Sequence, residues 1–388
     1  MNAQGEPATA PPSGAEPGTT PIEIRLVPIP ARLGTPDARP FEQAIEFTGI
    51  IEEEAWGNRD AWLGPASSLA EYGHSSFTHR TLLAAWRDGE VVGCGRVRYE
   101  LDANDRTAFV WVATAPSVRG QGLGDRMLAL VEELALDAGR STLSSYTDHS
   151  AQTIAAASPT ARRLAASVGA AVIPETDPRA RFAMRHGYAL AQMERVSVYE
   201  RAHGENGLPA LQRALAEAAQ RTGEDYELLS WGDETPEGYI DSFADALGRM
   251  ALDAPAADLL VEPELWNAER VREYESEAAI AGMGLLRAAA LDRTTGVIAA
   301  YTELELPAEH PTLAHQSDTL VLAEHRGNGL GMLLKAANLL SLAEVAPARR
   351  RVFTWNADEN EHMLRINRDL GFELLGYIGS WQKVLDTE

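Results

Sequence analysis

The stretch Arg119-Gly120-Gln121-Gly122-Leu123-Gly124 returns in the second half as Arg326-Gly327-Asn328-Gly329-Leu330-Gly331. Each copy follows an apolar run and opens a series of apolar residues with helical spacing. A glycine-rich turn between a strand and a helix exposes backbone N–H groups, and the helix dipole favours negative charge at that end. The sequence therefore predicts two anion-binding loops of one design.

The elements around the two loops repeat in the same order, which predicts two α/β domains in tandem. In the first half we expect strands at 22–30, 81–86, 91–101, 107–115 and 192–199, and helices at 41–56, 123–138 and 178–185. In the second half we expect strands at 226–231, 285–291, 297–306, 315–322, 351–355 and 374–382, and helices at 236–250, 263–281, 330–345 and 362–370. Residues 141–180 show no clear periodicity between these elements.

The predicted organisation has four parts, and the chain of 388 residues is long enough for two cores. Residues 1–21 are rich in Pro, Gly, Ala, Ser and Thr, which predicts a disordered tail. An N-terminal domain at 22–200 and a C-terminal domain at 224–388 follow, joined by a partly helical linker at 201–223.

Composition narrows the classes of function. A net charge of −23 argues against nucleic acid and anionic membranes as partners, because both require a basic surface. The same charge suits a cationic small substrate, or it only keeps the protein soluble. Cys94 is the single cysteine, so no internal disulfide can form, and no Cys/His cluster has zinc-ligand spacing. Since no signal peptide or transmembrane run is evident, we expect a cytoplasmic protein. Lys335 and Lys383 are the only lysines, which is typical of a GC-rich bacterial genome.

Two common glycine motifs do not fit the pattern. A dinucleotide-binding loop follows the first strand of a βαβ unit, whereas each loop here follows several hairpin-linked strands. A Walker loop carries Lys-Ser or Lys-Thr after its last glycine, whereas Asp125-Arg126 and Met332-Leu333 stand there.

The arrangement resembles the GCN5-related N-acetyltransferase (GNAT) superfamily, whose signature is a strand, then Gln/Arg-x-x-Gly-x-Gly/Ala, then a helix. Arg119, Gly122 and Gly124 fit this signature, and so do their second-half counterparts Arg326, Gly329 and Gly331. The resemblance implies a mixed-sheet α/β (α+β) fold with two tandem GNAT-like acyl-CoA N-acyltransferase domains. Such a two-copy architecture is similar to that of mycothiol synthase, without a close match in sequence.

The resemblance also implies a use for each loop, namely holding the pyrophosphate of the donor acetyl-CoA. The end of the preceding strand would pair with the pantetheine arm and bind the thioester carbonyl. In the second half these implied contacts are Thr319, Leu320, Val321, Arg326, Gly327, Asn328, Gly329, Leu330, Gly331, Asn356 and Asn360. In the first half they are Val112, Ala113, Thr114, Arg119, Gly120, Gln121, Gly122, Leu123 and Gly124. Asn360 is equally well explained as a helix cap.

The second half keeps more of the signature, so we expect catalysis there. The strand position that many relatives use for a general base carries His315, with Glu303 and Glu305 in reserve, whereas the first half has Ala108. A surface-loop role for His315 is the alternative. Where many relatives have a tyrosine acid this chain has Asn367, so the thiolate leaves unassisted or takes its proton from a group such as Tyr301. Asp148, His149 and Asp177 are secondary candidates in the first half.

These expectations describe an N-acetyltransferase in which an amine attacks acetyl-CoA directly. The acceptor is a small-molecule or peptide amine that the sequence does not identify, and a homo-oligomer is one possibility. The alternative is an acyl-CoA-binding or sensing protein without catalysis, in which both domains are degenerate.

Overall fold

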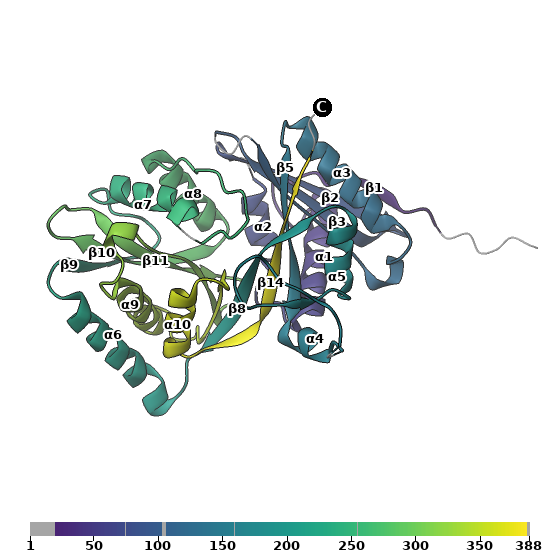
Figure 1. Cartoon of the computed structure of the whole chain (residues 1–388). Helices are drawn as coiled ribbons and strands as arrows, with labels where there is room; N and C mark the ends of the chain where they lie inside the picture. Colours follow the sequence, from purple (N-terminus) through teal and green to yellow (C-terminus); the bar gives the residue numbers. More distant parts are fainter. Residues whose placement is uncertain (1–19, 74, 103–105, 159, 254, 386–388) are drawn as a thin grey trace, which may run out of the picture.

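One mixed sheet of twelve strands runs through both halves of the molecule (Figure 1). The computed structural model describes residues 20–73, 75–102, 106–158, 160–253 and 255–385. The strand order is β1-β2-β3-β4-β5-β14-β8-β13-β12-β11-β10-β9, so the two halves meet at β14 and β8 in the centre. The predicted mixed-sheet fold class is therefore confirmed, and residues 1–19 of the predicted tail lie outside the described residues.

The strands of the large sheet follow the predicted order closely. Those of the first half are β1 (Glu23–Leu26), β2 (Thr78–Arg87), β3 (Glu90–Glu100), β4 (Thr107–Thr114), β5 (Thr142–Ser150) and β8 (Ala189–Glu200). Those of the second half are β9 (Tyr226–Trp231), β10 (Met283–Asp292), β11 (Ile298–Pro307), β12 (Leu313–Val321), β13 (Arg351–Ala357) and β14 (Phe372–Val384). A separate pair, β6 (Arg163–Leu164) and β7 (Ile173–Pro174), lies within the stretch that showed no clear periodicity.

Helices cover both faces of the sheet (Figure 1). The first half carries α1 (Arg39–Trp56), α2 (Pro65–Glu71), α3 (Leu123–Asp137), α4 (Ala151–Ala156) and α5 (Pro178–Arg185). The second half carries α6 (Leu208–Thr222), α7 (Ile240–Asp253), α8 (Ala268–Ile280), α9 (Leu330–Val345) and α10 (Glu361–Leu370). None of these described helices has the length and apolar content needed to span a bilayer.

Strand β3 shows how the two layers of helices are fixed by sequence. Its residues alternate between faces, as the period of a strand requires. Cys94 packs on α1, where its Sγ donates to the Ala44 carbonyl at 3.3 Å. Gly93 and Gly95 face α3, and a Cβ at either would lie within 3.0 Å of the Met127 or Val131 side chain. Glycine at these positions lets α3 approach the sheet closely.

A splayed pair of parallel strands occurs once in each half. Strand β4 pairs with β5 only from Thr107↔Thr142 to Phe109↔Ser144. Strand β12 pairs with β13 only from Leu313↔Arg351 to His315↔Phe353. Beyond these positions no further pairing occurs between the strands, all of whose residues are described. Each half therefore opens as a V in front of its glycine loop.

The last strand of each half lies in the sheet of the other half. Strand β8 pairs with β13, and β14 pairs with β5 along nine positions from Gly376↔Ser150 to Val384↔Thr142. The two exchanged strands also pair with each other at the centre of the molecule (Figure 1). Because of this exchange, Trp381 of β14 belongs to the hydrophobic core of the first half.

Candidate active site

Both glycine loops have the same backbone conformation. Gly122 and Gly329 each precede their helix with φ 77° and ψ 4°, and Gly120 and Gly327 also have positive φ. Residues with a Cβ rarely adopt this left-handed region, which explains the repeated glycines. Helices α3 and α9 begin directly after these glycines, as predicted, so both loops present backbone N–H groups at a helix N-terminus.

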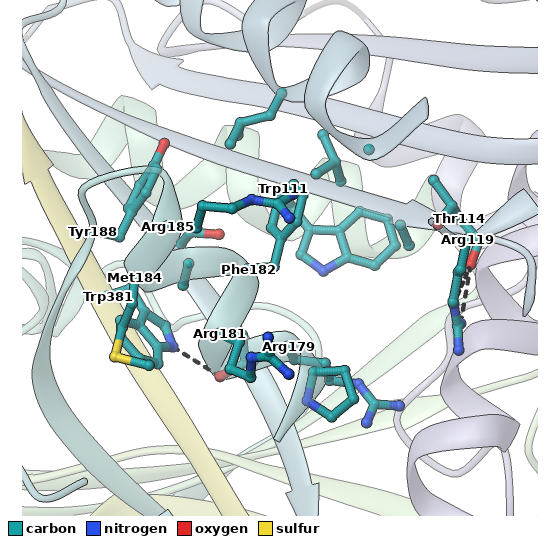
Figure 2. A pocket seen from close by; sticks show the side chains of 18 of the residues that line it. Trp111, Thr114, Arg119, Arg179, Arg181, Phe182, Met184, Arg185, Tyr188 and Trp381 are labelled. Atoms are coloured by element: carbon teal, nitrogen blue, oxygen red, sulfur yellow. Dashed lines mark hydrogen bonds between the residues drawn. The ribbon is translucent and has the colours of Figure 1, made fainter. Parts of the chain in front are cut away.

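A cavity of about 1000 Å³ fills the V of the first half (Figure 2). Its walls come from the glycine loop, the open ends of β4 and β5, helix α5, and Trp381 of the exchanged strand β14. Seven of the residues predicted to contact the donor line it, namely Val112, Ala113, Thr114, Arg119, Gly120, Gly122 and Gly124. Of the other two, Leu123 is buried beneath the loop, and Gln121 is exposed with its amide donating to the Ser117 carbonyl.

Four arginines line this cavity in a protein that is strongly acidic overall. Arg119 extends from the loop, and Arg179, Arg181 and Arg185 extend from α5 (Figure 2). Arg119 is held by Glu54 at 2.6 Å and by the Thr114 carbonyl, whereas Arg181 makes no ion pair with a described residue. A loop of backbone N–H groups beside several guanidinium groups can hold a ligand with several phosphates.

The inner end of the cavity meets a second pocket of about 120 Å³ beneath α1 and α2. The two spaces share Ile51, Trp111, Tyr146 and Asp148 as walls, so they are adjacent. Glu52 of α1 lines the second pocket together with Asp148 of β5. The outer cavity therefore leads from a phosphate-binding loop to a compact space that holds carboxyl groups.

Two of these carboxyl groups have perturbed acidities. Burial, reinforced by the nearby Asp148 carboxylate, raises the pKa of Glu52 to about 8. Burial also raises the pKa of Asp148 to about 6, against the opposing effect of His149 and Arg179. A carboxylate with a pKa near 7 to 8 is suited to accept a proton from an ammonium group at neutral pH.

The second half carries the same loop in different surroundings. Helix α6 packs along α9, and the Thr222 hydroxyl donates to the Asn328 carbonyl of the loop at 3.0 Å. A Cβ on Gly329 would lie 3.5 Å from the Cβ of Arg221. The Asp358 carboxylate, which follows β13, accepts backbone N–H groups of Ala170 and Ala171 from the first half. Helix α6 therefore contacts the loop at Asn328 and Gly329, and the first half contacts the end of β13, while Arg326, Gly327 and Asn328 stay exposed like their counterparts in the first loop.

The remaining residues of the second half that were predicted to contact the donor are buried or make hydrogen bonds within the protein. The Asn360 side chain caps α10 by accepting from the Met363 N–H at 3.1 Å, as the helix-cap alternative expects. Asn356 Oδ1 accepts from Asn367 Nδ2 at 2.6 Å, and the Thr319 hydroxyl lies 2.7 Å from that of Thr302. Leu320 is buried in the core, Val321 is half-buried, and the Val321 carbonyl accepts from Arg326 Nε at 3.2 Å.

His315 lies in β12 rather than in a surface loop, which corrects the alternative interpretation of this residue. Only 4% of it is exposed, and its Nε2 lies 2.7 Å from the Asp60 carbonyl of the first half. Burial lowers the pKa of His315. It pairs with Phe353 at the closed end of the V, so its visible role is to join the two halves. Catalysis by His315 stays a prediction that no contact in the structure supports.

The two reserve carboxylates belong to a buried ion network. Glu303 accepts from Arg287 Nε at 2.5 Å and from the Tyr274 hydroxyl at 2.6 Å, so its charge is compensated. Burial beside Glu303 raises the pKa of Glu305 to about 8. The suggested acid Tyr301 is fully buried, with its hydroxyl 3.3 Å from Asp318 Oδ2.

Sequence reasoning missed Glu52 as a site residue and ranked Asp148 second. Glu52 stands in the run Glu52-Glu53-Glu54, where only the helical phase of α1 distinguishes the inward carboxylate. Asp148 lies on β5, whose residues are mostly small and polar because one face borders the cavity. Two other candidates lie in that stretch. The Asp177 side chain caps α5, and His149 Nδ1 lies 3.4 Å from Asp177 Oδ2. The arginines of α5 were a usable signal, since three of them follow Asp177 within one predicted helix.

Comparison with known proteins agrees with this geometry. Residues 46–157 match the model of the acetyltransferase (GNAT) family. A tandem GNAT protein from the clavulanic acid biosynthesis pathway aligns over 95% of this chain and 100% of its own, with 24% identity and a TM-score of 0.67. A GCN5-related N-acetyltransferase from Sphaerobacter thermophilus aligns over 95% and 98%, with 16% identity and a TM-score of 0.56. No curated protein matches the sequence, and the similarity to mycothiol synthase stays a prediction.

Proposed function

We propose, from the premise that this chain carries a GNAT-family domain in its first half and the fold of a tandem GNAT protein throughout, that it transfers an acetyl group from acetyl-CoA to an amine. The observation that carries the proposal is the cavity of about 1000 Å³ between β4 and β5, which leads from the first glycine loop to Glu52. The same observation favours the first half as the active one, whereas the sequence pattern favoured the second.

The residues of the cavity suit the parts of acetyl-CoA. The N–H groups at the start of α3 would hold its pyrophosphate, and Arg181 would pair with a phosphate oxygen. The open edge of β4 at Val112, Ala113 and Thr114 offers backbone groups to the pantetheine arm. The thioester would then lie near Trp111, which lines both the outer cavity and the inner pocket.

Glu52 would serve as the general base. The acceptor arrives as an ammonium ion, and its first proton passes to the Glu52 carboxylate. The nitrogen lone pair then forms a bond to the thioester carbonyl carbon as the carbon–sulfur bond breaks. The second proton released from nitrogen neutralises the departing thiolate, which leaves an amide and free CoA. Asp148 holds the pKa of Glu52 high enough for this proton transfer near neutral pH.

A matched pair of substitutions tests which half is active. Gly122→Ala and Gly329→Ala introduce the same Cβ at the same φ and ψ, so both cost roughly 1–2 kcal/mol of backbone strain. We expect Gly122→Ala to lower kcat/KM for acetyl-CoA at least about tenfold and Gly329→Ala to leave it near the wild-type value. CoA release measured with a panel of amines provides the readout. Loss of turnover in Gly329→Ala alone would return the active site to the second half.

The alternative function is acyl-CoA binding without catalysis. Calorimetric titration with acetyl-CoA, run beside the release assay, separates the two functions. If acetyl-CoA binds and no amine of the panel accelerates CoA release, the transferase proposal is wrong and the binding function stands.

A further inference from the structure

We propose that the amine acceptor also carries a carboxylate, which binds Arg96 at the inner end of the pocket, so that the substrate class is amino-acid-like. This inference rests on the proposed function and names its acceptor. It comes from Arg96, which lines the inner pocket and forms no ion pair with a described carboxylate.

Arg96 enters the inner pocket from β3. It stands opposite Trp111 of β4 in the strand register, and its Cζ lies 5.0 Å from the Trp111 ring centroid. The indole of Trp111 points into the cavity in Figure 2, and Trp111 and Arg96 both line the inner pocket. Arg96 is therefore within reach of a compact acceptor whose nitrogen faces the thioester.

The carboxylates of Glu52 and Glu71 act on the Arg96 guanidinium electrostatically without forming an ion pair with it. Its Nε is buried without a hydrogen-bond partner, and no ion pair joins it to a described carboxylate. The nearby Glu71 is engaged elsewhere, since its Oε1 lies 3.5 Å from Arg80 Nε. A buried guanidinium without a partner is costly, and a carboxylate matches its donors in a planar, bidentate way.

Other residues that line the pocket suit an ammonium group. Glu52 and Asp148 supply carboxyl groups there, and the rings of Trp62, Tyr72 and Tyr146 complete the walls. Aromatic faces and carboxylates together stabilise a cation in a confined space. The pocket therefore holds groups that suit an ammonium group and a group that suits an anion, which is the charge pattern of an amino acid.

A simple polyamine fits this pattern less well. Its second ammonium group would approach Arg96, where like charges repel, although the acidic surface of the protein would attract it. The carboxylate could also arrive on the acyl group of the donor instead of on the acceptor. The experiment below separates these two sources.

The test measures CoA release by the full chain with acetyl-CoA and matched acceptors. β-Alanine and γ-aminobutyrate are compared with their carboxamides, larger amino acids are compared in the same way, and putrescine serves as a cationic acceptor without a carboxylate. We expect each acid to exceed its amide in kcat/KM by roughly 10- to 100-fold, the range for losing a hydrogen bond to a charged group. Arg96→Gln should bring that ratio close to one, and Arg96→Lys should restore part of it.

Controls separate recognition from folding. Arg98 lies on the same strand and the same face but is exposed, so Arg98→Gln should keep the wild-type acid-to-amide ratio. The dissociation constant for acetyl-CoA should be unchanged in Arg96→Gln, because Arg96 does not line the outer cavity. An unchanged constant also shows that the variant is folded.

Several results would overturn the inference. Equal use of acids and amides by the wild type would refute it while leaving the transferase function intact. A preference for malonyl-CoA or succinyl-CoA that Arg96→Gln abolishes would assign the carboxylate to the donor and refute it as well. If acetyl-CoA binds but no acid, amide or diamine accelerates CoA release, the proposed function itself fails.

Discussion

At the scale of single residues, the proposed mechanism depends on Glu52 and Asp148. Both are buried at the inner end of the cavity, and neither forms an ion pair with a described residue, although Arg96 acts on Glu52 and Arg179 on Asp148 electrostatically. Burial disfavours the charged form of each, and the Asp148 carboxylate disfavours it further in Glu52. One carboxyl group is thereby kept available as a proton acceptor near neutral pH.

The pH dependence of turnover should report this pair. Because Glu52 must be deprotonated to act and its pKa is raised to about 8, we expect kcat/KM to rise with pH and to level off above about 8. Glu52→Gln should lower kcat/KM roughly 10²- to 10⁴-fold, as removal of a general base does, and abolish this rise with pH. Asp148→Asn removes a negative neighbour, which lowers the pKa of Glu52, so kcat/KM should rise at lower pH than in the wild type. If the rise of kcat/KM with pH is unchanged in both variants, Glu52 is not the general base.

Arg181 should contribute to donor binding without affecting proton transfer. It lines the cavity from α5 without an ion pair to a described residue, whereas Arg365 takes the same place relative to the glycine that ends α10. We expect Arg181→Gln to raise KM for acetyl-CoA about tenfold at unchanged kcat, since a hydrogen bond to a charged group contributes roughly 1.5 kcal/mol or more. Arg365→Gln is the matched control and should leave KM as it is. Initial-rate kinetics check both, and a reversed result would point to the second half.

At the scale of elements, the sequence predicted most helices and strands because local signals mark them. The glycines with positive φ fix the start of α3 and α9, and the Asp-Pro pair at Asp177 fixes that of α5. Strand β5 was missed because Thr142–Ser150 borders a cavity and lacks the usual apolar alternation. The half that we propose as active could not be chosen from sequence, because the proposal rests on a cavity built by β4, β5, α5 and the exchanged strand β14.

Lys335 of helix α9 should destabilise the folded protein. Lys335 stands where α3 has Leu128, is 1% exposed, and its Nζ has no hydrogen-bond partner in the described structure. Burial lowers its pKa to about 7. We expect Lys335→Met to raise the free energy of unfolding at pH 7 by roughly 1–3 kcal/mol, because a buried unpaired polar group is replaced by an apolar one of similar shape.

The pH dependence of stability provides the control for Lys335. Between pH 7 and about 10 the unfolded chain binds a proton at this lysine that the folded protein does not hold, so wild-type stability rises with pH. The advantage of Lys335→Met in urea titrations should therefore shrink as the pH rises from 7 to 10. An advantage that does not change over this range would show that the lysine is not responsible.

At the scale of the whole molecule, the exchanged strands make the two halves one folding unit. Strand β14 covers the edge of β5 along nine register positions, and the Trp381 indole donates to the Thr147 hydroxyl at 2.8 Å in the wall of the cavity. Strand β8 likewise covers the edge of β13. Sequence could not predict this exchange, because the alternation of a strand shows which face is buried but not which strand lies beside it.

The exchange predicts that neither half folds alone. A fragment that ends at residue 203 lacks β14, so it loses Trp381 from its core and leaves β5 with an open edge; a fragment that begins at residue 204 lacks β8. We expect each fragment to show no cooperative unfolding transition, and co-expression of the two to restore one transition and acetyl-CoA binding. The control is the full chain cleaved at a protease site introduced at residues 203–205, which are exposed and leave both exchanged strands in place. A fragment that unfolds cooperatively on its own would show that its half is complete without the strand from the other half.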